Sequence, residues 1–248
     1  GLTKLMIDKA ACWFEITGRS LSLRPMAKII SLETASTNCS VSVYQGTELL
    51  SLKEDPSPRY THGELLHVFM DEAMDEAGLG REDLDAVAVS KGPGSYTGLR
   101  IGVASAKGLC FALDLPLIAI PTLQSLAAQF QIEAGVMIPM LDARRMEVYA
   151  AVFNSDLQEV GPTRAEIITE DSFAEWREMG PVHLLGYGSE KCREVLTHPN
   201  FHFHTNLQPS ARELGLLASG RFSAGEFEDI AYFEPFYLKD FIAHKKKP

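Results

Sequence analysis

The sequence predicts an α/β protein made of two similar lobes, because one pattern of strands and turns occurs twice. The first copy begins with the apolar run KIISLE at 28–33 and continues as the alternating segment CSVSVY at 39–44. The second copy begins with VMIPMLD at 136–142 and continues as MEVYAAVF at 146–153. Alternating apolar and polar residues indicate half-buried strands. Each copy is therefore expected to form a small antiparallel sheet.

Helical periodicity follows each of these units. After the first unit, the pattern predicts helices at 62–77, 97–113 and 122–130, with strands at 84–90 and 115–120. After the second unit it predicts helices at 171–179, 189–196 and 211–220, with a strand at 182–186. Alternating strands and helices extend a sheet with parallel strands that the helices cover. Two such lobes describe the duplicated ribonuclease-H-like architecture of the actin and hexokinase superfamily.

We expect the chain to divide into three parts. Residues 1–25 are predicted to be an N-terminal extension outside the core, because charged residues interrupt their apolar run and Met26 begins a natural first strand. Residues 26–121 are expected to form the first lobe, which carries the partner-binding helices. Residues 122–248 are expected to form the second lobe, and the sequence leaves open whether the C-terminal stretch packs back on the first.

Composition narrows the classes of function. The 248-residue chain has a formal net charge of −10, the wrong sign for a protein that neutralises nucleic-acid phosphates by itself. Its four cysteines form no CxxC pair, so neither a disulfide framework nor a zinc site is indicated, and a cytoplasmic location fits. The basic run at 245–247 is predicted to be a solvated tail, with an RNA contact as the alternative.

The glycine-rich stretch SKGPGSYTGLRIGVASAKG, at 90–108, fits no standard phosphate-binding motif. It matches neither GxxxxGK[ST] nor GxGxxG. It predicts a strand that ends in a tight turn and a helix that opens near Tyr96 or Thr97. The free backbone N–H groups of such a helix start can bind an anion, and a purely structural turn is the alternative.

Two first-lobe helices are apolar over a wider arc than one sheet contact requires. In the helix at 97–113, Gly98, Gly102, Ala106 and Cys110 form a stripe of small residues where another backbone can approach closely. Such helices bury their second side inside the chain or present it to a partner. The expected partner interface consists of Leu66, Phe69, Met70, Ala73, Met74, Gly98, Ile101, Gly102, Ser105 and Ala106.

Candidate catalytic and metal-binding residues do not form convincing sites. His62 and His67 are five residues apart, so one helix face cannot present both to a zinc ion. His202 and His204 share one side of an extended segment, but no third ligand is near in sequence. No serine lies in a GxSxG turn. The sequence therefore predicts neither a catalytic residue nor a metal site.

The loop after the first strand resembles the first phosphate loop of the actin and hexokinase superfamily, where an acid holds hydrated magnesium. The glycine of that loop is missing here, and LDAR at 141–144 lacks the glycine of the second phosphate loop. We therefore expect no cofactor beyond weak nucleotide or anion binding. The residues expected at that weak site are Glu33, Thr34, Ser36, Thr37, Gly94 and Ser95.

Five segments resemble the TsaB (YeaZ) family, in the same order and over nearly all of residues 28–241. They are IISLETASTNCSVSVYQG, SKGPGSYTGLRIGVASAKGL, IPTLQSLA, IPMLDARRMEVYAAVF and PFYLKDF. The resemblance implies a non-catalytic dimerisation subunit of the complex that makes N6-threonylcarbamoyladenosine beside the anticodon of tRNA.

The resemblance also implies the partners. TsaD would be the catalytic subunit, bound through the helices at 62–77 and 97–113, and the ATPase TsaE would join the pair. The chain would contact tRNA only through the complex, form a homodimer when alone, and need no membrane. The alternative from another class is an ATP-dependent enzyme that uses Glu33 and Asp142, and a metallopeptidase is a third reading.

Overall fold

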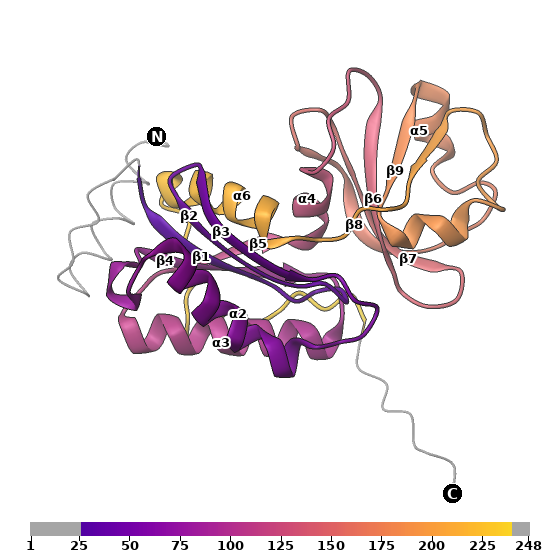
Figure 1. Cartoon of the computed structure of the whole chain (residues 1–248). Helices are drawn as coiled ribbons and strands as arrows, with labels where there is room; N and C mark the ends of the chain where they lie inside the picture. Colours follow the sequence, from indigo (N-terminus) through magenta and orange to yellow (C-terminus); the bar gives the residue numbers. More distant parts are fainter. Residues whose placement is uncertain (1–25, 240–248) are drawn as a thin grey trace, which may run out of the picture.

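The computed structural model describes residues 26–239, which fold into two lobes, each built on a five-stranded mixed sheet (Figure 1). The predicted extension at 1–25 and the basic run at 245–247 lie outside the described residues. Within residues 26–239, no helix combines the length and the apolar character that a membrane span requires.

The first sheet has the spatial strand order β3-β2-β1-β4-β5. Its strands are β1 (Lys28–Glu33), β2 (Cys39–Gln45), β3 (Glu48–Asp55), β4 (Ala86–Gly92) and β5 (Leu117–Pro121). β1, β2 and β3 pair antiparallel, as alternating segments joined by short turns do. β4 pairs parallel with β1, and β5 pairs parallel with β4, after helical crossovers.

The second sheet repeats this plan with the order β10-β9-β6-β7-β8. Its strands are β6 (Val136–Asp142), β7 (Glu147–Phe153), β8 (Glu159–Ile167), β9 (Val182–Leu185) and β10 (Phe201–His204). β6, β7 and β8 are antiparallel, while β9 and β10 continue parallel to β6. The predicted duplication of a ribonuclease-H-like lobe is therefore confirmed.

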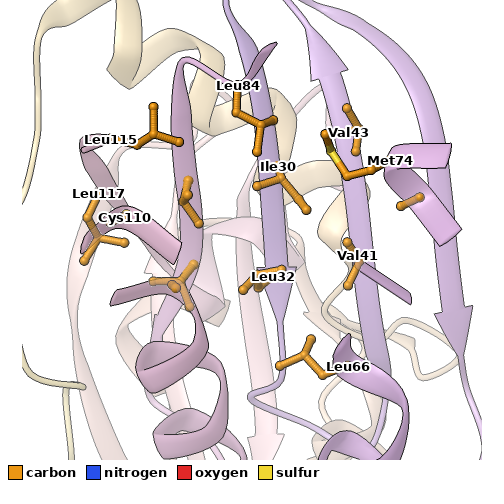
Figure 2. Packing of buried hydrophobic residues seen from close by; sticks show 14 of the residues in the cluster. Ile30, Leu32, Val41, Val43, Leu66, Met74, Leu84, Cys110, Leu115 and Leu117 are labelled. Carbon is orange, nitrogen blue, oxygen red and sulfur yellow. The ribbon is translucent and has the colours of Figure 1, made fainter. Parts of the chain in front are cut away.

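Two long helices cover one face of the first sheet. α2 (His62–Ala77) and α3 (Tyr96–Leu113) lie side by side beneath the strands (Figure 1). Leu66 and Met74 of α2 and Cys110 of α3 belong to one buried cluster with residues of the sheet. In this cluster Met74 lies beside Val43, and Cys110 lies beside Leu117 (Figure 2). These apolar residues recur at helical spacing on the inner sides of the helices, and their burial holds the helices to the sheet.

The opposite face of the first sheet is covered by α6 (Ala211–Ala224), which the sequence grouped with the second lobe. A Cβ atom at Gly215 would lie 2.5 Å from the ring of Tyr44, so only glycine lets the helix come this close. Ser42 Oγ donates a hydrogen bond to the Ala211 carbonyl at 2.6 Å. The assignment of 211–220 to the second lobe is corrected accordingly.

The segment after α6 stays on the first lobe. Glu228 N donates to the Leu117 carbonyl at 2.8 Å, and Phe236 N donates to the Lys91 carbonyl at 2.7 Å. Lys107 Nζ of α3 donates to the Phe233 carbonyl at 3.0 Å. The C-terminal stretch therefore crosses the edge strand β5 and reaches the glycine turn at the start of α3.

The helices of the second lobe are short. α4 (Thr122–Ala127) and α5 (Ala174–Met179) have six residues each. The helix predicted at 189–196 is instead the 3₁₀ segment η2 (Tyr187–Cys192), in which Ser189 N bonds the Gly186 carbonyl three residues back. A further 3₁₀ turn, η1 (Arg81–Asp83), precedes β4.

Candidate functional site

The glycine turn between β4 and α3 is packed against the loop that follows β1. Ser95 N donates to the Ala35 carbonyl at 2.7 Å, and a Cβ atom at Gly94 would collide with that carbonyl. Ser95 Oγ accepts a hydrogen bond from Gly98 N at 3.3 Å and so caps α3. Two N–H groups of this turn are thus already paired within the chain, so fewer donors are free to bind an anion.

Glu33, at the end of β1, is completely buried. Its Oε1 accepts hydrogen bonds from Ala35 N at 2.7 Å and from Ser90 Oγ at 2.8 Å. Its Oε2 is buried without a hydrogen-bond partner among residues 26–239. Burial raises the pKa of this carboxyl to about 7. An acid that holds hydrated magnesium needs access to solvent, and Glu33 has none.

The other residues of the expected nucleotide site form hydrogen bonds with neighbouring residues of the first lobe that lie outside the expected set. Thr34 is buried, and its Oγ1 donates to the Gly98 carbonyl at 2.8 Å. Ser36 Oγ accepts from Asn38 N at 3.2 Å. Of the four loop residues expected at this site, Ser36 and Thr37 are half-buried, so they keep the most access to solvent.

The stripe of small residues on α3 faces the chain's own loop. A Cβ atom at Gly98 or Gly102 would collide with Thr34. On α2, likewise, Leu66 packs inward on the sheet. The expected interface is corrected at six buried positions, which offer a partner no side-chain surface: Leu66, Ala73, Met74, Gly98, Gly102 and Ala106.

The outer sides of the same helices remain open. Phe111 of α3 is 85% exposed and Val68 of α2 is 47% exposed. We call these two residues, together with the half-buried Phe69, Met70, Ile101 and Ser105 of the same two helices, the α2–α3 surface. The expected interface contained neither Val68 nor Phe111. A bulky aromatic between Gly108 and Ala112 was the signal that could have revealed Phe111.

The histidines are arranged differently from what the sequence suggested. His62 is buried, with Nε2 2.8 Å from the Ser36 carbonyl oxygen. His183 lies beside His204, with its Nδ1 3.1 Å from Nε2 of His204, because β9 and β10 pair in parallel. Burial lowers the pKa of both imidazoles. Across residues 26–239, no group of three or more His, Cys, Asp or Glu side chains could hold a metal ion.

An open groove of about 710 Å³ lies between the C-terminal segment, the glycine turn and β8. Its charged lining comprises Glu159, Glu228, Asp229 and Glu234, with Lys91 as the basic residue. This excess of carboxylates repels anions, so the groove does not suit the phosphate chain of a nucleotide.

Comparison with known proteins gives a consistent set of relatives. Residues 59–246 match the family model described as TsaD, tRNA N6-adenosine threonylcarbamoyltransferase. The Bacillus subtilis protein named tRNA threonylcarbamoyladenosine biosynthesis protein TsaB is 35% identical over 131 residues, which cover 50% of this chain and 55% of that protein. The chain thus spans about half the length of this relative.

Two further matches extend over more of the chain. The Escherichia coli protein of the same name is 27% identical over 230 residues, which cover 89% of this chain and 98% of that protein. The solved structure of YeaZ from Pseudomonas aeruginosa superposes with a TM-score of 0.75 at 27% identity, and covers 86% of this chain and 100% of that one.

Proposed function

Since the chain belongs to the family that the TsaD model describes, with TsaB (YeaZ) proteins as its relatives, we propose that it is a non-catalytic subunit in tRNA threonylcarbamoyladenosine biosynthesis. In this proposal it binds a TsaD-type catalytic subunit in the cytoplasm. The observation that carries the proposal is the α2–α3 surface, where two long neighbouring helices leave apolar side chains in solvent.

The chemistry of this surface suits protein docking. Phe111 is a large aromatic side chain that is almost completely exposed, and aromatic anchors supply much of the affinity at protein interfaces. His67 and Ser105 link the two helices across the surface at 3.3 Å. A partner that covers the α2–α3 surface removes apolar area from water, which contributes about 25 cal/mol per Å².

The alternative, an ATP-dependent enzyme, finds less support. It requires Glu33 and Asp142 to face a nucleotide, whereas Glu33 is sealed in the first lobe. We therefore expect only weak nucleotide binding and no turnover by the chain alone. Calorimetry with ATP and magnesium tests this, and tight binding with hydrolysis would favour the alternative.

The direct test changes the α2–α3 surface without disturbing the fold. Phe111→Asp should weaken binding to the TsaD protein of the same genome on the order of 100-fold, because it places a charge in an apolar contact. Met179→Asp is the matched control, since Met179 is 77% exposed on α5 of the second lobe. Equal binding by both variants in calorimetry would contradict the proposal.

The α2–α3 surface also predicts how the chain associates with itself when no partner is present. Without a partner, we expect the chain to pair through the α2–α3 surface as a homodimer, because a twofold contact buries the patch on both copies. Phe111→Asp should then be monomeric on a sizing column. We expect TsaE to bind the assembled pair, and tRNA to bind the assembled complex.

A further inference from the structure

The turn between β6 and β7 holds two arginines in a backbone conformation that arginine disfavours. Arg144 has φ 72° and Arg145 has φ 50°, both in the left-handed region that glycine and asparagine prefer. Hydrogen bonds from Ala143 N to the Glu147 carbonyl, at 3.0 Å, and from Glu147 N to the Arg144 carbonyl, at 3.2 Å, fix the turn. Backbone strain of this kind concentrates where a side chain has a function.

The acids beside this turn are already paired with lysines. Lys191 Nζ lies 2.5 Å from Asp142 Oδ1 and donates to the Glu147 carbonyl at 2.7 Å. Lys239 forms an ion pair with the Glu147 carboxylate. Two lysines from distant parts of the chain thus neutralise both carboxylates that could otherwise have paired with the arginines.

The arginines themselves remain unpaired. Both are exposed, and neither guanidinium forms an ion pair or hydrogen bond with any residue from 26 to 239. They are also the only adjacent pair of Lys or Arg residues in that range, within a chain of net charge −10. Tyr149 lies next to them, and burial raises the pKa of its phenol, an effect that Lys239 and Arg144 only partly offset.

We propose that the two arginines of this turn, Arg144 and Arg145, contact the phosphodiester backbone of tRNA when the chain is in its complex. The inference rests on the proposed function, which supplies the tRNA. A guanidinium matches a phosphate group in two parallel hydrogen bonds. Because the chain as a whole carries a net charge of −10, such a contact adds to tRNA binding by other subunits and does not hold tRNA by itself.

The test replaces the pair by Arg144→Asn with Arg145→Gly, residues that suit the left-handed backbone and leave the turn intact. Labelled tRNA is titrated with the assembled complex over a series of salt concentrations. The affinity should fall on the order of tenfold, and the slope of log affinity against log salt should fall by about 1 to 2. Arg59→Gln with Arg193→Gln removes the same charge from other exposed positions and should change affinity less than about twofold.

The remaining outcomes separate this inference from the proposed function. If the variant complex assembles and binds tRNA as the wild type does, the tRNA contact is wrong and the proposed function stands. If the variant loses only assembly, or only ATP binding in calorimetry, the turn binds a protein or a nucleotide and the inference is overturned. If the wild-type chain never assembles, the proposed function fails. In that case labelled tRNA is titrated with the chain alone. Binding that the arginine substitutions weaken would support the tRNA contact, and any other result would overturn it.

Discussion

The loops at 34–38 and 143–146 occupy the same place in the two lobes but have opposite environments. Each follows the first strand of its sheet, after Glu33 in one lobe and Asp142 in the other. Glu33 is fully buried, whereas the side chain of Asp142 is 63% exposed and pairs with Lys191. The glycine turn before α3 closes over the first loop alone. Duplication has therefore kept the topology and changed the chemistry.

The helices show the same divergence. α2 and α3 have 16 and 18 residues and leave the α2–α3 surface open. In the second lobe, α4 and α5 have six residues each and present no comparable pair of long helices (Figure 1). A surface for docking is therefore expected on the first lobe, and a charged contact on the second.

The largest effect is expected from two glycines of α3 that face opposite ways. Gly102→Leu should lower the free energy of unfolding by about 3 kcal/mol or prevent folding, because its side chain would collide with Thr34. Gly108→Leu should be neutral or stabilising by up to about 1 kcal/mol, because no atom lies within 4 Å of its Cβ position. Denaturant unfolding measures both. Similar free energies of unfolding for the two variants would show that Gly102 does not pack against Thr34.

An effect of at most comparable size, dependent on pH, is expected from the buried acid of the first loop. The pKa of Glu33 is raised from 4.5 to about 7 by burial, so the folded state binds the proton more tightly than the unfolded state. Its contribution to stability is complete below about pH 4.5 and is lost as the pH rises through 7, a change on the order of 3 kcal/mol.

Glu33→Gln removes this titration while keeping the shape of the side chain. Relative to wild type, the variant should therefore gain stability as the pH rises from about 4.5 to about 7, the interval between the unfolded and folded pKa values. The measurement is denaturant unfolding of both proteins across this range. Parallel pH profiles would mean that Glu33 does not carry the proton.

The smallest effect is expected from the strained turn of the second lobe. Arg144→Asn with Arg145→Gly should raise the free energy of unfolding by about 1 to 2 kcal/mol, because both replacements accept a positive φ. Asp114→Gly, at the left-handed end of α3, is the first-lobe comparison and should gain less, since aspartate tolerates this region. Thermal unfolding measures both variants. A loss of stability in the turn variant would show that the backbone at Arg144 and Arg145 is not strained.

The regular pattern of the chain made much of the fold predictable. The apolar periodicity of 62–77 predicted both ends of α2 correctly, and the alternating segments predicted the antiparallel strands. Contacts between distant segments left no such signal. The contact of Gly215 with the ring of Tyr44 joins residues that are far apart in the sequence, as does the contact of His183 with His204. Such contacts depend on how the strands and helices pack, which local patterns do not show.

The site was predictable in its helices but not in their orientation. A stripe of small residues such as Gly98 and Gly102 fits a close approach by a partner as well as by the chain's own loop, and the loop at Thr34 takes it. Exposure of Phe111 depends on how α3 lies on the sheet, which its sequence does not specify.

Docking of a catalytic subunit on α2 and α3 can be measured by amide hydrogen exchange of the chain, with and without the TsaD protein of the same genome. Binding should slow exchange in 62–77 and 97–113 and leave α5 at 174–179 unchanged. Protection confined to the second lobe, or none in α2 and α3 of a formed complex, would contradict this docking.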